Sequence, residues 1–239
     1  MIWIDHLQLF SALDFTAIAI LITAWLMIGW RIEHPSPSRI SVSNLMANYR
    51  REWLRQFVGR EPRVFDAQIM ANLRQGAAFF ASATMIAIGG GLALIGDVDQ
   101  LQSVANVLTP VSTSEIVWEI KLLVMILFIT NAFLKFVWAH RLFGYCSVVM
   151  SAVPNDPNDP KAFARADKAA ELNITAARSF NRGMRSTYFA LASAAWLVGA
   201  TALICTTLFT CLVLWRREFA SHSRKALCDL KDDMGQSHK

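Results

Sequence analysis

Apolar residues in this chain gather in long runs instead of recurring at helical or strand spacing. Four runs are mostly apolar over the length that a helix needs to cross a bilayer. They cover residues 13–30, 76–95, 117–139 and 187–215. The pattern therefore predicts an all-α integral membrane protein with four transmembrane helices. We expect a single helical membrane domain over residues 1–239, ending in a polar tail at 216–239.

Composition alone would not decide this, because hydrophobic residues make up 54% of the chain, slightly above the level of a soluble domain. The N-terminus lacks a basic region and carries Asp5 and Asp14. We therefore expect the first run to be retained and not removed as a signal peptide. The cysteines form no C-x-x-C pair and are expected to be small packing residues.

The charges between the runs predict an orientation. Residues 31–75 and 140–186 are rich in Arg and Lys, whereas 96–116 has neither. By the positive-inside rule the two long loops are cytoplasmic and the N-terminus lies outside the cell (inner) membrane. Four crossings then place the tail 216–239 outside, although the tail is also basic.

Two helices are expected on the cytoplasmic side. Residues 41–58 predict an amphipathic helix whose apolar face includes Tyr49, Trp53 and Phe57. This face suits either the plane of the inner leaflet or packing on the ends of the spans. The pair Asp159-Pro160 predicts the start of a second helix, expected to run over 160–215 as one long helix entering the fourth span.

Small residues predict where helices approach one another in the membrane. Ala83, Ala87 and Gly91 recur at four-residue spacing in the second span, and Ala195 and Gly199 do so in the fourth. We favour packing within one molecule over an oligomer interface.

Asn131 is the strongly polar residue left deep in the third span. Lys121 and Lys135, by contrast, are far enough apart to reach opposite interfaces. We expect Asn131 to form a hydrogen bond between helices.

Residues that carry chemistry are sparse. No nucleophile–base pair or known catalytic motif occurs, and His140 is the one histidine near the end of a span. We expect no enzyme, no catalytic residue, no metal and no cofactor. The basic loops favour anionic lipid headgroups and argue against nucleic acid.

Four stretches resemble the domain-of-unknown-function family 599 of bacterial and plant membranes. They are residues 59–68 (GREPRVFDAQ), 79–84 (FFASAT), 135–146 (KFVWAHRLFGYC) and 179–185 (SFNRGMR) with Tyr188 and Phe189. The resemblance implies a helical membrane protein, without an established activity or ligand.

Polar residues in or near these stretches are expected to meet at the inner ends of spans two to four. They are Asp66, Arg74, Lys135, Arg141, Asn181, Arg182 and Arg185. Such a cluster would either clasp the helix ends or bind an anionic headgroup, a ligand or a partner, because several arginines meet few acids.

These features favour a non-enzymatic accessory, scaffold or assembly subunit of a larger membrane complex. Its expected partners are the lipid bilayer and a protein partner or a second copy of the chain. The alternative is a small transporter or channel acting as an oligomer, with Asn131 and Lys135 lining the path.

Overall fold

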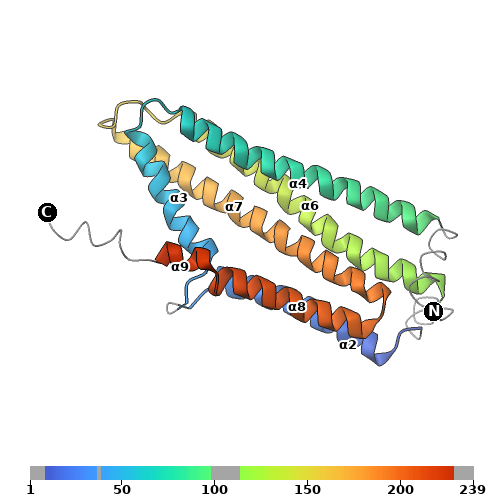
Figure 1. The fold of residues 1–239 in the computed structure, drawn as a ribbon. Helices are drawn as coiled ribbons and strands as arrows, with labels where there is room; N and C mark the ends of the chain where they lie inside the picture. Colours follow the sequence, from blue (N-terminus) through green and yellow to red (C-terminus); the bar gives the residue numbers. More distant parts are fainter. Residues whose placement is uncertain (1–8, 37–38, 98–113, 229–239) are drawn as a thin grey trace.

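The computed structural model describes residues 9–36, 39–97 and 114–228 (Figure 1), and within them every regular element is a helix. Four helical segments are long and apolar enough to cross a membrane, which confirms the predicted all-α membrane fold. They are α2 (Ala12–Glu33), α4 (Val64–Gly96), α6 (Glu115–Ser151) and Ala200–Cys228, which joins α8 (Ala200–Phe219) to α9 (His222–Cys228). The two other long helices are α3 (Val42–Val58) and α7 (Pro160–Ala194).

Local capping signals explain where these helices begin. The Asp14 amide donates to Ser11 Oγ (3.3 Å) and the Ser11 amide donates to Asp14 Oδ2 (3.0 Å), so the start of α2 is capped reciprocally. Ser41 caps α3. Asp159 caps α7, whose first turn contains Pro160. Both α3 and α7 begin where the sequence predicts them.

The single helix predicted over 160–215, and with it the continuous span 187–215, is wrong. Helix α7 ends at Ala194, a short 3₁₀ turn covers Ala195–Leu197, and α8 starts in the reverse direction at Ala200 (Figure 1). Gly199 allows the reversal because its φ of 156° is a conformation that residues with a Cβ rarely adopt. Ala195 and Gly199 therefore form a turn.

Helix α7 runs along the bundle beside α4 and α6, so within the described residues the chain passes along the bundle once more than the four candidate spans do (Figure 1). The indole of Trp196, in the 3₁₀ turn that follows α7, donates to Asp14 Oδ1 at the start of α2 (2.7 Å). Its hydropathy is low because its second half carries three arginines, at 178, 182 and 185. Arg185 is tolerated because α7 lies against α2, α3, α6 and α8 and Glu33 neutralises its charge, whereas Arg178 and Arg182 are exposed.

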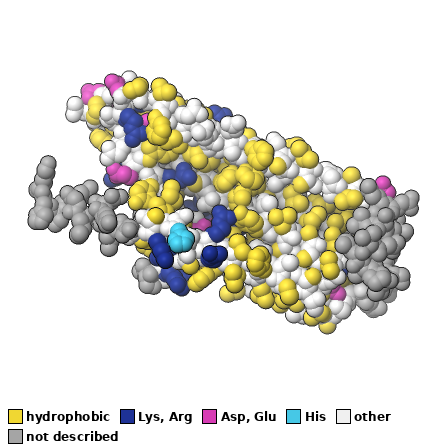
Figure 2. All heavy atoms as spheres, in the orientation of Figure 1, with side chains coloured by type: hydrophobic (Ala, Val, Ile, Leu, Met, Phe, Trp, Pro, Cys, Tyr) yellow, Lys and Arg dark blue, Asp and Glu magenta, His cyan; other side chains and the backbone are white. Residues whose placement is uncertain are grey.

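The two ends of the bundle differ in charge. The basic end is formed by α3, α9, the starts of α4 and α7 and the ends of α2, α6 and α8, and the acidic end by the starts of α2, α6 and α8 (Figure 1). Figure 2 shows Lys and Arg side chains gathered at the basic end, beside a broad hydrophobic surface.

The described part of the C-terminal tail, residues 216–228, lies at the end of the bundle that holds both basic loops, whereas four crossings predict it at the other end. Arg224 Nε donates to the carbonyl of Ile40 (3.0 Å), next to the start of α3. Residues 216–228 therefore belong to the basic end, together with both basic loops, because the chain runs along the bundle in α7 before it returns in α8. Residues 229–239 of the predicted tail lie outside the described residues.

Two apolar cores follow one another along the bundle. The first lies in a region that we call the extension: α3 with residues 64–77, 139–151 and 160–176. The second lies in the crossing part, where α2 and α8 pack against the remainder of α6 and α7. Both α6 and α7 contribute to both cores.

Helix α4 contacts α6 through a different set of residues from the predicted one. Met70, Ala77, Thr84 and Gly91 are buried at seven-residue spacing, the period of a left-handed helix pair. Ala83 and Ala87 are exposed. Gly91 is needed there, because an added Cβ would lie 2.9 Å from Ile126 Cγ1. The predicted four-residue spacing shares one residue with this contact, Gly91, because the buried residues of α4 recur every seven residues.

Candidate anion site at the basic end

Helix α3 packs against the first half of α7 in the antiparallel direction. Arg51 Nε lies 2.8 Å from Glu171 Oε1, and Arg55 Nε lies 3.2 Å from Asp167 Oδ1. Leu54 and Phe57 are buried against the alanines of α7, while Tyr49 is exposed. The apolar face of α3 therefore packs largely on the bundle, which is one of the two arrangements that the sequence left open.

The start of α3 is fastened to the end of α8. The Ser43 amide and the Ser43 hydroxyl each donate to the Glu218 carboxylate, both at 3.0 Å. A carboxylate at this position also stabilises the positive end of the helix dipole. Ser41 Oγ donates to the carbonyl of Ile32 (2.9 Å), which fixes α3 to the end of α2 as well.

Glu33, the last residue of α2, binds two arginines of α7. Arg182 Nε donates to Glu33 Oε1 (2.8 Å), and the terminal nitrogens of Arg182 and Arg185 also donate to this carboxylate. The Arg185 side chain is only 9% exposed and that of Glu33 17%. This ion pair is therefore largely shielded from solvent.

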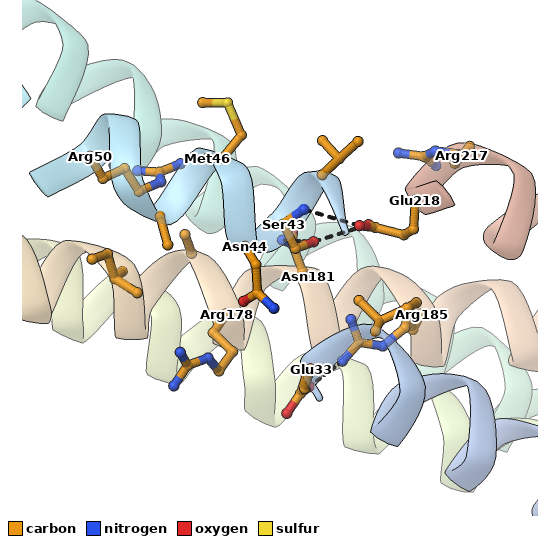
Figure 3. A pocket seen from close by; sticks show the side chains of 15 residues that line it. Glu33, Ser43, Asn44, Met46, Arg50, Arg178, Asn181, Arg185, Arg217 and Glu218 are labelled. Atoms are coloured by element: carbon orange, nitrogen blue, oxygen red, sulfur yellow. Dashed lines mark hydrogen bonds and ion pairs between the residues drawn. The ribbon is translucent and has the colours of Figure 1, made fainter. Parts of the chain in front are cut away.

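Helices α2, α3, α7 and α8 enclose a cavity of about 250 Å³ between these contacts (Figure 3). We call it the arginine cavity, because four arginines line it: Arg50, Arg178, Arg185 and Arg217. Its two carboxylates are Glu33, bound to Arg182 and Arg185, and Glu218, bound to Ser43.

Three of the cavity arginines have no carboxylate partner among the described residues. Arg50 donates to the side-chain oxygen of Asn173, and burial lowers the pKa of Arg50. Arg217 donates to the Tyr188 hydroxyl (2.6 Å). Arg178 is exposed at the cavity, without a hydrogen bond to another described residue. The cavity thus offers positive charge that no described acidic group neutralises.

The seven predicted cluster residues do not form one cluster. Asn181 and Arg185 line the arginine cavity, and Arg182 reaches its Glu33. Asp66 lies elsewhere, fully buried, and accepts from Trp53 Nε1 and Arg60 Nη1, both at 2.6 Å.

The remaining three members lie on α4 and α6. Arg74 lines a second cavity of about 420 Å³ between these two helices. Arg141 donates to Tyr145 on its own helix (2.8 Å), and Lys135 is half-buried on α6. None of the three lines the arginine cavity.

Asn131 lies where α6 crosses α7. Its amide donates to Ser186 Oγ (3.0 Å), and that hydroxyl donates to the carbonyl of Phe128 (2.8 Å). This is a hydrogen bond between helices. It engages the side-chain amide of Asn131, the polar group that a transport path along α6 would need.

Several cavity residues were missed by the sequence argument. Arg50 and Arg178 belong to the basic loops 31–75 and 140–186, whose charges predict only an orientation. Glu33 and Glu218 follow apolar runs and resemble ordinary loop residues. The signal that would have found them is the reversal at Gly199, which brings the end of α8 back to α2 and α3.

No group of three or more His, Cys, Asp or Glu side chains suited to a metal ion occurs within residues 9–36, 39–97 and 114–228. The chemistry that the site offers is therefore binding of negative charge by guanidinium groups.

Comparisons with known proteins assign the chain to a family. Neither the curated proteins nor the solved structures give a significant match to the chain. Residues 16–223 match the family described as "Protein of unknown function, DUF599", a range that contains every residue of the arginine cavity, and the chain belongs to that family.

Proposed function

We propose that this protein is a non-catalytic membrane protein that binds an anionic group in the arginine cavity, as an accessory or assembly subunit of a membrane complex. The observation that carries the proposal is the composition of the cavity: four arginines line it, and both of its carboxylates are already engaged. Guanidinium groups match phosphate and carboxylate oxygens in pairs. The ligand is a lipid headgroup or a soluble anion of the same chemistry.

The basic end faces the cytoplasm in this proposal. The two basic loops favour that side, and the basic tail now adds to them, because α8 returns to the same end. A bound anion would then come from the cytoplasm or from the inner leaflet.

Cys228 provides a direct test of this orientation, because it is exposed in α9 at the basic end, whereas Cys146 is buried. A membrane-impermeant maleimide should label Cys228 in inverted vesicles and leave it unlabelled in intact spheroplasts. Labelling from outside the cell would contradict the proposed cytoplasmic position of the basic end, because α9 belongs to that end. A Cys228→Ser variant is the control for labelling at the other cysteines.

Anion binding is tested by thermal unfolding of the purified full-length protein. Inorganic phosphate and soluble dihexanoyl phosphatidylglycerol are titrated separately, and at least one should raise the melting temperature of the wild type. The Arg50→Ala/Arg178→Ala variant should lose about tenfold or more in affinity, because a hydrogen bond to a charged group contributes roughly 1.5–3 kcal/mol.

The matched control removes the same number of charges from the same two helices outside the cavity. Arg51→Ala/Lys168→Ala should respond like the wild type, since neither residue lines the cavity. Arg178→Ala alone guards against a folding defect, because Arg50 also bonds Asn173. No response to either anion, or an equal response in both double variants, would refute the proposal.

A further inference from the structure

The arginine cavity adjoins a groove at the junction of α8 and α9, which is separate from the cavity that Arg74 lines. This hollow, the α8 groove, has a volume of about 370 Å³ and shares Arg217 with the arginine cavity. Phe209, Leu212 and Val213 line one part of it, and Arg216, Arg217, His222 and Lys225 line the other. An apolar floor and a basic rim therefore lie next to the arginine cavity, joined by one side chain.

The apolar part of the groove faces outward from the bundle. Phe209 and Leu212 are 67% and 60% exposed, on the side of α8 that turns away from the core residues Leu203 and Leu214. In a membrane protein such a surface is in contact with acyl chains. Figure 2 shows the corresponding change along the molecule, from a hydrophobic surface to gathered basic side chains over α8 and α9.

The depth of the basic rim matches that of lipid phosphates. Helix α8 has 20 residues, so it rises about 30 Å, the thickness of the hydrocarbon core. Arg216 and Arg217 are in its last turn, at the edge of that core, where the headgroup region of the leaflet begins. Tyr188, which binds Arg217, has the amphipathic ring that favours the same depth.

We propose that the anionic group in the arginine cavity is the headgroup of a glycerophospholipid from the leaflet at the basic end, held through the α8 groove. Its phosphate is bound by Arg217, which lines both hollows, with Arg216 on the groove side and Arg50 and Arg178 on the cavity side. Its acyl chains lie on Phe209, Leu212 and Val213. This assignment rests on the proposed function, and it adds the source of the ligand and the surface along which it arrives.

The charge of the site selects the class of lipid. The rim and the cavity together present five arginines and a lysine, against Glu33 and Glu218, which are already bound within the protein. A zwitterionic headgroup carries its own cation, which these arginines repel. An anionic headgroup has no such cation, so the site should prefer anionic to zwitterionic lipids of equal chain length.

The experiment measures retention of dioleoyl phosphatidylglycerol and dioleoyl phosphatidylcholine on the full-length protein by native mass spectrometry. The wild type should retain the first over the second. Phe209→Ala/Leu212→Ala should lower the affinity for phosphatidylglycerol about tenfold, because two apolar contacts with the chains are removed. Its response to inorganic phosphate in the thermal assay should stay that of the wild type.

The matched control truncates two equally exposed residues outside the groove, Leu191→Ala/Leu208→Ala, and should retain lipid like the wild type. Equal retention in both double variants would overturn the lipid assignment. The lipid assignment would also be overturned if inorganic phosphate raised the melting temperature of the wild type while the wild type retained no phosphatidylglycerol. The proposal that the cavity binds an anion would remain supported in that case. The proposed function would be refuted as well if neither phosphate nor dihexanoyl phosphatidylglycerol changed the melting temperature and the protein retained no dioleoyl phosphatidylglycerol.

Discussion

The extension and the crossing part differ in where the contacts between polar groups of neighbouring helices lie. In the extension both ion pairs between α3 and α7 lie at the surface, with side chains 47–60% exposed, around a core of alanines with Leu54 and Phe57, and its buried carboxylate, Asp66, is held by Trp53 and Arg60. In the crossing part the polar pairs lie inside, as with Asn131 and Ser186, while leucine and phenylalanine face outward.

The difference follows from the solvent on each side. Water solvates the rim of the extension, so exposed ion pairs there contribute little to stability. Lipid offers no partner for a polar group, so the crossing part keeps such groups between helices, where an unmade bond is costly. The same kind of arginine–carboxylate contact should therefore matter very differently in the two regions.

Removing Glu33 should have the largest effect. Glu33→Ala leaves Arg185, which is nearly buried, without its carboxylate, and the expected loss is about 3–5 kcal/mol in the free energy of unfolding. Unfolding of the purified protein in mild detergent measures this loss. A loss no greater than that of a surface pair would contradict the comparison between the regions.

Gly183→Ala should come next, because α7 lies directly against Phe136 of α6 at this position. The added Cβ would lie 2.7 Å from Cε1 of Phe136, whose ring is held by Phe80 and Phe180. Overpacking here should cost about 2 kcal/mol. Gly144→Ala, in open space on α6, is the control and should be at least as stable as the wild type, because alanine favours the helix.

Gly199→Ala tests the reversal that separates α7 from α8. No atom obstructs a Cβ at this position, so the expected cost of about 1 kcal/mol comes from the backbone conformation alone. The melting temperature should fall, and Gly90→Ala, also in open space but inside α4, should not lower it. An unchanged melting temperature in Gly199→Ala would argue against the turn.

Glu171→Ala should have the smallest effect. It removes the exposed partner of Arg51 in the extension and should change the unfolding free energy by about 0.5 kcal/mol or less. Compared with Glu33→Ala, this variant gives the ratio that the comparison of the two regions predicts. Similar losses for the two would show that depth in the bundle does not decide the strength of these pairs.

Much of the fold was predictable because single local signals determine it. The long apolar runs found α2, α4 and α6, and the pair Asp159-Pro160 found the start of α7. The path of α7 along the bundle was missed because Arg178, Arg182 and Arg185 lower its hydropathy. Glu33, the partner of Arg182 and Arg185, is about 150 residues earlier in the chain, and no window along the sequence contains the carboxylate and the two arginines.

The site was only partly predictable for a related reason. Asn181, Arg182 and Arg185 were grouped correctly near one end of a span, but Asp66 and Arg74 belong to other places. The position of a residue along its span predicts its depth in the membrane, but not which neighbouring helix its side chain contacts. Those contacts depend on which helices are neighbours, and the reversal at Gly199 places α8 beside α2.

Arg182 and Arg185 also make α7 a poor signal for insertion into the membrane on its own, since a central arginine costs about 2.5–3.5 kcal/mol at this step. The chain makes α2, with Glu33, long before α7, and apolar α8 directly after it. Helices α7 and α8 should therefore insert into the membrane as a pair. By then α2 is already in place, and its Glu33 can bind the two arginines. A chain cut after Ala194 would leave α7 at the membrane surface.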